Sequence, residues 1–188
     1  ILVDNEGAAR DAVKRLVNAG HRKIGMIAGP EDIYTAKERL KGFRAAVREA
    51  GADTDEALIA RGNYTIEGGA AAMWKLHEQN PDMTAVFISN YEMTVGAMME
   101  INDLGIRVPD ELSVIGFDNV DFARASVPKL SIVTQPTVKI AHAAADILLG
   151  RLEGRIPEEH ENEDDADGQE LSATVTLKTG FVEGRSVR

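Results

Sequence analysis

Several apolar segments in this chain are each followed by a side chain that could hydrogen-bond a polyol. In chain order, these side chains are Arg39, Tyr64, Asn90 and Asp118. A guanidinium offers a rigid fork of N–H donors, a carboxylate accepts from two hydroxyls, and an amide does both. An aromatic ring can cover the apolar face of a sugar ring. These residue types together predict a site for a sugar or another polyol.

The elements that would position these side chains alternate along the sequence. Strands are expected at residues 1–3, 23–28, 57–60, 84–89, 112–117 and 130–135, and helices at 6–19, 35–50, 66–79, 91–104 and 136–152. Such alternation indicates an α/β fold with βαβ units and a mostly parallel sheet. Ligands of open α/β sheets bind outside the carboxyl ends of the strands. We therefore expect the candidate side chains at one edge of the sheet.

Thr35 and Arg39 lie four residues apart at the start of an expected helix and so share one face. Thr35 is most simply the N-cap of that helix, although it is kept as a candidate site residue. Arg39 has an alternative as a solvated helix residue paired with Glu38 or Glu31.

The other candidates have structural alternatives too. Asn90 and Asp118 could simply cap the elements that follow them, and Tyr64 on a loop could serve packing rather than stacking. The convergence of all of them on one sheet edge favours a binding site over any of these explanations taken singly.

The composition restricts the function class. The chain has 188 residues, a net charge of -10 and no cysteine, and its length allows one large domain or two small ones. The lack of cysteine excludes a disulfide scaffold, a thiolate metal site and a cysteine nucleophile, and it fits a reducing compartment. The acidic balance argues against nucleic-acid binding by this stretch. The sequence shows neither a membrane span nor a signal peptide.

The acidity is concentrated in one segment. Residues 157–170 carry eight acidic side chains and no basic one, so the rest of the chain has a net charge of only -2. The segment lacks the alternating carboxylates of a calcium loop. It is expected to form a solvated loop.

The common catalytic and metal-binding motifs are missing. The sequence contains no phosphate-binding glycine loop, no G-x-S-x-G and no H-E-x-x-H, and its four histidines show no ligand spacing. We therefore expect neither an enzyme nor a cofactor nor a metal site.

The expected helix 91–104 is apolar nearly all round. A helix that packs on one sheet face needs a single apolar stripe, and Val95, Met98 and Met99 exceed it. The surplus predicts a subunit interface in a homodimer. The alternative is burial beneath another element of the same chain.

Four longer motifs follow one another along the chain: GHRKIG, RLKGF, RVPDELSVIGFDN and LSIVTQP. In this order they resemble the LacI/GalR family of bacterial transcriptional regulators, and the match covers nearly the whole chain apart from the acidic segment. The resemblance implies a type I periplasmic-binding-protein-like fold with two lobes, a sugar or small metabolite as effector, and a helix-turn-helix headpiece that binds operator DNA.

The resemblance also implies how this chain is organised. It is expected to begin at the first crossover between the lobes, so that the headpiece, the hinge and most of the N-terminal lobe are absent. Residues 1–120 would form the C-terminal lobe, and 121–160 the crossover and the returning segment of the N-terminal lobe. Residues 161–170 would be the acidic loop and 171–188 the closing strands.

The effector-contacting positions of the family fall onto the same four side chains, Arg39, Asp118, Tyr64 and Asn90. Two positions depart from the family pattern. Tyr91 stands where the family usually has Asp, so local contacts to the effector would differ. Ile33 stands where purine-binding relatives carry a second Arg, which weighs against a purine effector. The family dimerises partly through the helix that matches residues 91–104.

These observations predict the effector-sensing, dimerising core of a cytoplasmic LacI/GalR-type regulator, a repressor that reaches operator DNA only through the missing headpiece. The first alternative is a periplasmic sugar-binding protein that feeds an ABC transporter. An α/β enzyme is the more distant alternative, and it would require a cluster of titratable groups with perturbed pKa values.

Overall fold

The computed structural model describes residues 1–153 and 174–188. The segment expected to form an acidic loop, residues 157–170, lies outside this described part of the chain. The chain divides into two compact units, each described by itself. The larger contains Asn5–Thr134 and Thr179–Arg188, and the smaller contains Ile1–Asp4 and Gln135–Lys178.

The larger unit is built on a six-stranded sheet with the order β3-β2-β4-β5-β6-β8. The strands are β2 (Ile24–Ala28), β3 (Ile59–Arg61), β4 (Ala85–Ile88), β5 (Ser113–Phe117), β6 (Ser131–Thr134) and β8 (Gly180–Val182). The first five are parallel, and β8 runs antiparallel to β6. Every residue of β2, β4 and β5 is buried. Burial of both sheet faces explains why these strands are continuous apolar runs in the sequence.

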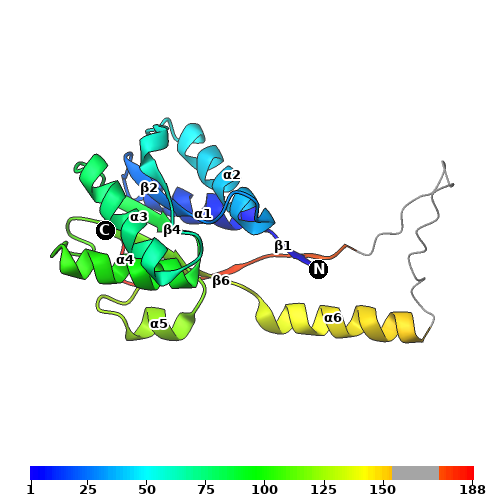
Figure 1. The fold of residues 1–188 in the computed structure, drawn as a ribbon. Coiled ribbons are helices and arrows are strands. Elements are labelled where there is room, and N and C mark those ends of the chain that lie inside the picture. The colour runs from blue at the N-terminus through cyan, green and yellow to red at the C-terminus, as the bar shows by residue number, and fades with distance from the viewer. Residues whose placement is uncertain (154–173) are drawn as a thin grey trace. The chain divides into compact units, whose positions relative to one another are not determined.

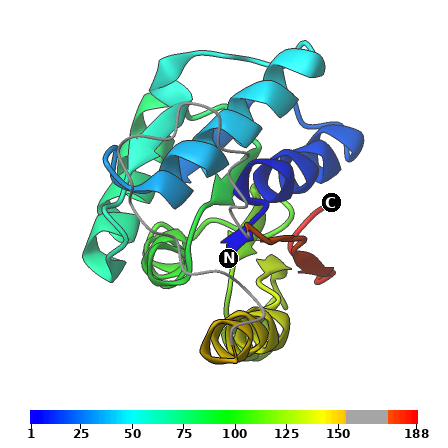
Figure 2. The same ribbon diagram turned by 90° about the vertical axis from the view of Figure 1, so that its right-hand side faces the viewer.

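Helices cover both faces of this sheet (Figures 1 and 2). Helices α1 (Asn5–Asn18) and α2 (Tyr34–Glu49) share one apolar core with Met26 and Phe87 of the strands. Helices α3 (Ile66–Gln79) and α4 (Tyr91–Asp103) share the other core with Ile27 and Ile88. Neighbouring strand residues thus point to opposite cores. The expected α/β class and the parallel sheet are confirmed.

Two local predictions were wrong. A short helix, α5 (Val120–Ala125), stands where a loop was expected after β5. Asn119 caps its N-terminus, and the side-chain oxygen of Asn119 accepts a hydrogen bond from the Phe122 N–H at 3.0 Å. A short turn, η1 (Glu56–Leu58), occupies the first part of the strand expected at residues 57–60.

The C-terminal tail, in which closing strands were expected, forms two short strands that do not pair with each other. Strand β7 (Thr176–Leu177) pairs with β1 (Leu2–Val3), whereas β8 pairs with β6. The two short strands belong to different sheets because the chain passes from the smaller unit to the larger between them. Beyond β8, the fully buried Ser186 donates to the Val114 carbonyl and accepts from the Ser131 N–H.

The smaller unit contains β1, β7 and helix α6 (Thr137–Leu152). Of the residues of α6, only Gly150 is buried within the described chain, and Val138, Leu148 and Leu152 are more than half exposed. No helix within residues 1–153 and 174–188 is long and apolar enough to cross a membrane.

Candidate functional site

Unusual backbone geometry gathers at the carboxyl ends of β3 and β5. The described residues contain four non-glycine positions with positive φ, and all lie in the loops after these strands: Asn63, Tyr64, Asp118 and Asn119. Their φ angles are between 50° and 65°. Such conformations cost free energy and cluster at functional sites. This edge is the one at which the sequence predicted a ligand site.

Arg39 is the best-fixed side chain of this edge. It is only 4% exposed, its Nε donates to Asn5 Oδ1 at 2.9 Å, and its Nη1 donates to the Ser89 carbonyl. Its central guanidinium carbon lies 3.7 Å from the centroid of the Phe117 ring. The alternative of a solvated helix residue paired with a neighbouring glutamate is therefore wrong.

The electrostatic surroundings of Arg39 link it to two other candidates. Burial lowers the pKa of Arg39, while its interactions with Tyr64 and Asp118 raise that pKa. An arginine stays protonated under all these influences. Arg39 is therefore a fixed cation at this edge. The Asp118 carboxylate and the Tyr64 phenol are close enough to interact with its charge.

The Tyr64 ring lies against the backbone of the loop after β2. A Cβ atom at Gly29 would come within 2.3 Å of Tyr64 Cε1, so a side chain at position 29 would displace the ring. The Tyr64 hydroxyl lies 3.3 Å from Thr35 Oγ1. These contacts hold the half-buried ring at the edge.

Thr35 is not the N-cap of its helix. Helix α2 starts one residue earlier, at Tyr34, with Ile33 in the cap position and no capping side chain. The N-cap interpretation of Thr35 is wrong because the helix has already begun there. Instead, the Thr35 side chain contacts the hydroxyl of Tyr64, which is 29 residues away in the sequence.

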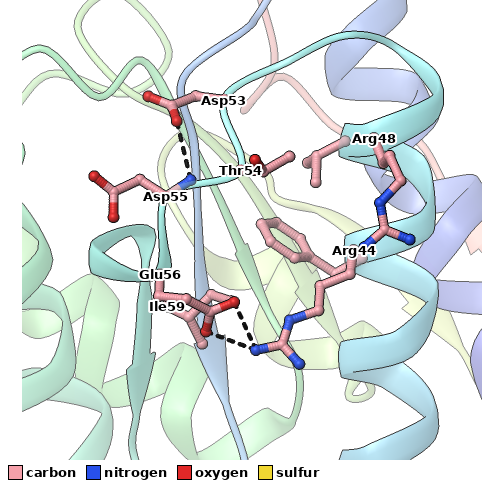
Figure 3. A pocket seen from close by; sticks show the side chains of 9 residues that line it. Arg44, Arg48, Asp53, Thr54, Asp55, Glu56 and Ile59 are labelled. Carbon is pink, nitrogen blue, oxygen red and sulfur yellow. Dashed lines mark hydrogen bonds and ion pairs between the residues drawn. The ribbon is translucent and has the colours of Figure 1, made fainter.

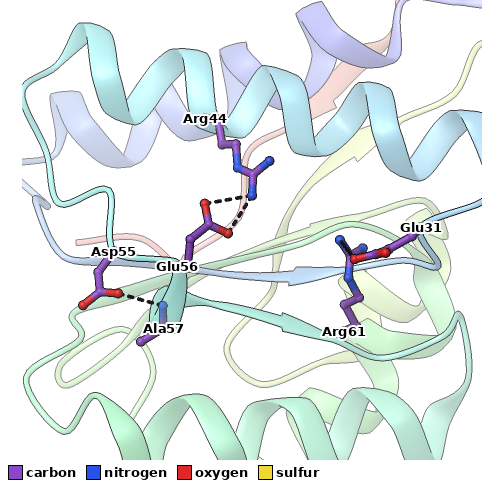
Figure 4. A network of polar contacts seen from close by, with 6 residues as sticks. All are labelled: Glu31, Arg44, Asp55, Glu56, Ala57 and Arg61. Carbon is purple, nitrogen blue, oxygen red and sulfur yellow. Dashed lines mark hydrogen bonds and ion pairs between the residues drawn. The ribbon is translucent and has the colours of Figure 1, made fainter.

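Arg61 at the end of β3 holds the loop on which Tyr64 rests. Its Nη1 donates to the Gly29 carbonyl at 2.8 Å, and its Nη2 pairs with Glu31 Oε1 at 2.8 Å (Figure 4). Because Gly29 lies close to the Tyr64 ring, this bond holds the backbone against which the ring rests. Sequence reasoning missed this residue.

Asn90 and Asp118 differ in their capping roles. Asn90 is 9% exposed, and its Oδ1 accepts from the Met93 N–H at 3.0 Å while its Nδ2 donates to Glu92. The capping interpretation of Asn90 is confirmed. Asp118 is half-buried, and the cap of the following helix is Asn119, so the capping interpretation of Asp118 is wrong.

The structure therefore brings Thr35, Tyr64 and Arg39 together with Asp118 around one sheet edge. Sequence reasoning missed two residues that hold Arg39, Asn5 and Phe117. Asn5 follows the short strand β1 as Asn90 follows β4, and this similarity is the signal that could have identified it. Within the described residues, no group of three or more histidine, aspartate or glutamate side chains could hold a metal ion.

Helix α4 buries much of the apolar surplus noted in its sequence. Met98 is 7% exposed and packs in the core shared with α3, Val95 is half-buried, and Met99 is 55% exposed. The helices approach closely because Gly96 has no side chain; a Cβ there would meet the Ile66 carbonyl. Burial within the chain therefore explains Met98, and Met99 is the largest exposed apolar side chain of this helix.

Comparisons with known proteins agree with this fold. The model of a periplasmic binding protein-like domain matches residues 13–169. A transcriptional regulator CelR–cellobiose complex has a TM-score of 0.86 and 34% identity, over 98% of this chain and 52% of that one. The Escherichia coli transcriptional repressor ascG has a TM-score of 0.82 and 30% identity, over 100% of this chain and 63% of that one.

Curated relatives give the same result. The HTH-type transcriptional regulator CelR of Thermobifida fusca is 38% identical over 156 residues, which are 83% of this chain and 46% of the relative. The HTH-type transcriptional repressor CytR of Escherichia coli (strain K12) is 40% identical over 155 residues, which are 82% of this chain and 46% of the relative.

The parallel sheet with helices on both faces agrees with the matching family model, and the chain belongs to the periplasmic binding protein-like domain family. Within the family it is an effector-binding domain of the LacI/GalR type. The chain spans about half the length of the curated relatives it matches.

Proposed function

We propose that this chain is the effector-sensing part of a LacI/GalR-type transcription regulator, a repressor, and that its effector is a sugar or a sugar-like molecule. The observation that carries the proposal is the buried Arg39, held at the sheet edge beside Asp118 and Tyr64. The relatives support it, since they are named as HTH-type regulators and one neighbour is a complex with cellobiose. The same names favour a regulator over a transporter component or an enzyme.

The contacts of Arg39 define how it would hold a ligand. Asn5 and the Ser89 carbonyl take Nε and Nη1, so Nη2 is the nitrogen that donates to a ligand hydroxyl. The Asp118 carboxylate accepts from neighbouring hydroxyls, and the Tyr64 ring covers the apolar face of the sugar. Thr35 and Asn90 complete the polar edge. Because Arg39 is already fixed, little side-chain entropy is lost when the ligand binds.

The signal to DNA requires parts beyond this chain. In the proposed whole protein, the larger unit is the C-terminal lobe, the segment returning after β6 belongs to the N-terminal lobe, and an attached headpiece binds operator DNA in the cytoplasm. The ligand changes DNA affinity only through its differential affinity for two arrangements of the protein.

The proposed regulator is a homodimer that uses the exposed side of α4. Met99 is the exposed anchor, Val95 lies beside it half-buried, and Met98 supports them from the core. A Met99→Glu substitution would place a charge in this interface and should shift the sedimentation coefficient of the regulator toward that of a monomer. The matched control is Lys75→Glu on the exposed part of α3, and an unchanged dimer in Met99→Glu would exclude this interface.

The function is tested by a thermal-shift screen of sugars and sugar phosphates, cellobiose included, on the regulator with its headpiece. A true ligand raises the unfolding midpoint and changes operator affinity in a gel-shift assay. Arg39→Ala should weaken binding of that sugar by about 2 kcal/mol in calorimetry, because the ligand hydroxyl loses its donor. The exposed Arg124→Ala should leave it unchanged. Sugar binding without any effect on operator DNA would favour the transporter component.

A further inference from the structure

A cavity lies in the larger unit, away from the sheet edge that carries Arg39 and Tyr64. It has a volume of about 300 Å³ and is formed by the C-terminal half of α2, the loop and turn at residues 53–56, and Ile59, and we call it the α2 pocket (Figure 3). Ile59 at the start of β3 lines it, whereas Tyr64 follows the other end of that strand. Figure 4 shows the two ends, one marked by the pair of Arg44 with Glu56 and the other by Arg61. This volume is at the lower limit of the roughly 300–1,000 Å³ typical of small-molecule sites.

The loop that forms one wall of the α2 pocket is fixed by its own hydrogen bonds. The Asp53 carboxylate accepts from the Asp55 N–H at 3.0 Å, and the Asp55 carboxylate accepts from the Ala57 N–H at 2.9 Å. Asn80 Nδ2 donates to the Ala57 carbonyl at 2.9 Å and so ties the loop to the end of α3. The wall is therefore formed before any ligand arrives.

Arg44 faces this loop with one of its donors uncompensated. Its Nη2 donates to both carboxylate oxygens of Glu56, at 2.8 and 2.6 Å. Its Nε is enclosed, and no atom of the described residues accepts a hydrogen bond from it. Because a buried donor without an acceptor costs free energy, the pairing with Glu56 does not satisfy all the donors of Arg44. Arg48 adds a second cation one helical turn further along the same wall.

The remaining wall of the α2 pocket is apolar. Phe43 and Val47 are 2% and 1% exposed, and their accessible atoms together with the half-buried Ile59 form its floor. The pocket thus combines an apolar floor with cations on the helix side and carboxylates on the loop side (Figure 3).

We propose that the α2 pocket binds a small zwitterion of the amino-acid class with an apolar side chain. The ligand carboxylate accepts from Nε and one terminal nitrogen of Arg44, which gives the enclosed donor its acceptor. Glu56, released by Arg44, accepts from the ligand ammonium. The apolar side chain covers Phe43 and Val47.

The charge balance of the lining selects this class of ligand. Two arginines and three acidic residues line the pocket, so a dianion would be repelled from the loop side. A simple carboxylate would leave the released Glu56 without a cation, and a simple amine would leave Arg44 without an anion. Only a molecule with both charges satisfies both partners, and its binding is independent of the sugar proposed at the other edge.

Two-dimensional ¹H–¹⁵N NMR of the full chain tests the proposal with three probes that share one apolar body. These are L-phenylalanine, 3-phenylpropionate, which lacks the ammonium, and phenethylamine, which lacks the carboxylate. We expect L-phenylalanine to shift the amide signals of residues 43–59 saturably and at least about tenfold more tightly than either analogue, the factor that one lost charged hydrogen bond implies. Equal shifts with all three, or none with L-phenylalanine, would overturn the proposal.

Variants separate the site from an unspecific effect. Arg44→Gln and Glu56→Gln should each weaken L-phenylalanine binding about tenfold or more, since each removes one charged partner. Arg10→Gln is the matched control, because Arg10 pairs with Glu49 at a similar exposure, 42% against 43% for Arg44, and neither residue lines the pocket. Unchanged affinity in a folded Glu56→Gln variant would contradict the proposal even if Arg44→Gln failed to fold.

Discussion

The guanidinium of Arg39 lies on the ring of Phe117, with 3.7 Å between the central carbon and the ring centroid. Phe117 is the last residue of β5, and Asp118 follows it directly. One strand end therefore supplies both the apolar support beneath the cation and the carboxylate that stabilises its charge. A cation–π contact of this kind offsets part of the hydration that Arg39 loses on burial.

The bond between Arg39 and Asn5 should be measurable as a coupling between α2 and α1. Asn5→Ala leaves Arg39 Nε without its acceptor and should lower the free energy of unfolding by about 1–3 kcal/mol. Arg39→Met leaves the acceptors on Asn5 and Ser89 unpaired and should cost more. In urea unfolding, the double variant should lose less than the two single losses combined, because both remove the same bond.

An exposed asparagine provides the control for this cycle. Asn102→Ala on α4 should change the free energy of unfolding by no more than about 0.5 kcal/mol. Strict additivity of Asn5→Ala and Arg39→Met would show that the two side chains do not stabilise each other.

Gly29 should be intolerant of a side chain only while Tyr64 is present. In Gly29→Ala, the new Cβ meets the ring at 2.3 Å, so the ring must move and stability should fall by about 1–3 kcal/mol. In a Tyr64→Ala background the same substitution should be nearly neutral. Thermal unfolding of the four proteins checks this, and an equal loss in both backgrounds would mean that the ring is not the obstacle.

Arg61 should affect ligand binding more than stability. Its ion pair with Glu31 is exposed and contributes little, whereas its bond to the Gly29 carbonyl holds the loop beneath Tyr64. Arg61→Met should therefore reduce sugar affinity several-fold in calorimetry, and the stability loss should stay near 1 kcal/mol. Glu31→Gln should keep the affinity, because the bond to Gly29 remains. A similar affinity loss in both variants would indicate that the ion pair, and not the carbonyl bond, positions the ring.

His21 should make stability depend on pH. The side chain is 5% exposed, its Nδ1 lies 2.9 Å from Thr84 Oγ1, and burial, with the nearby charge of Arg188, lowers its pKa. The folded state thus binds fewer protons than the unfolded state, whose histidine has its ordinary pKa of about 6.5. The neutral, buried His21 therefore makes its full contribution to the free energy of unfolding above that pH. This contribution is lost as the pH falls below it, because the unfolded state then takes up the proton more readily.

The measurement is urea unfolding at several pH values between about 7.5 and 5, the range in which an ordinary histidine titrates. His21→Gln, which has no titrating group, should show a flatter profile. An unchanged slope in His21→Gln would assign the pH dependence to other groups.

Local sequence patterns predicted most of the fold. Continuous apolar runs located the buried strands, and the asparagine cap located the start of α4 at Tyr91. The start of α2 was missed by one residue because no side chain caps it at Ile33. The helix α5 was missed because it is only six residues long.

The sequence was sufficient to predict which side chains of the candidate site lie at the ends of strands. The topological rule for parallel sheets brought Arg39, Tyr64 and Asp118 to one edge. The supports of these side chains were not predictable, since Asn5 and Arg39 are 34 residues apart and Arg61 and Gly29 are 32 apart. Only the folded chain brings such pairs into contact, and neither has a local pattern of its own.

The antiparallel pairing of β8 with β6 has a consequence for biosynthesis. Residues Gly180–Val182 are synthesised only after β6, which ends at Thr134, and after the whole of α6. During translation, one side of the parallel sheet therefore keeps unpaired backbone N–H and carbonyl groups until β8 has been synthesised. Such an open strand edge invites intermolecular pairing. The nascent larger unit is thus exposed to aggregation along β6 until β8 has been synthesised and has paired with it.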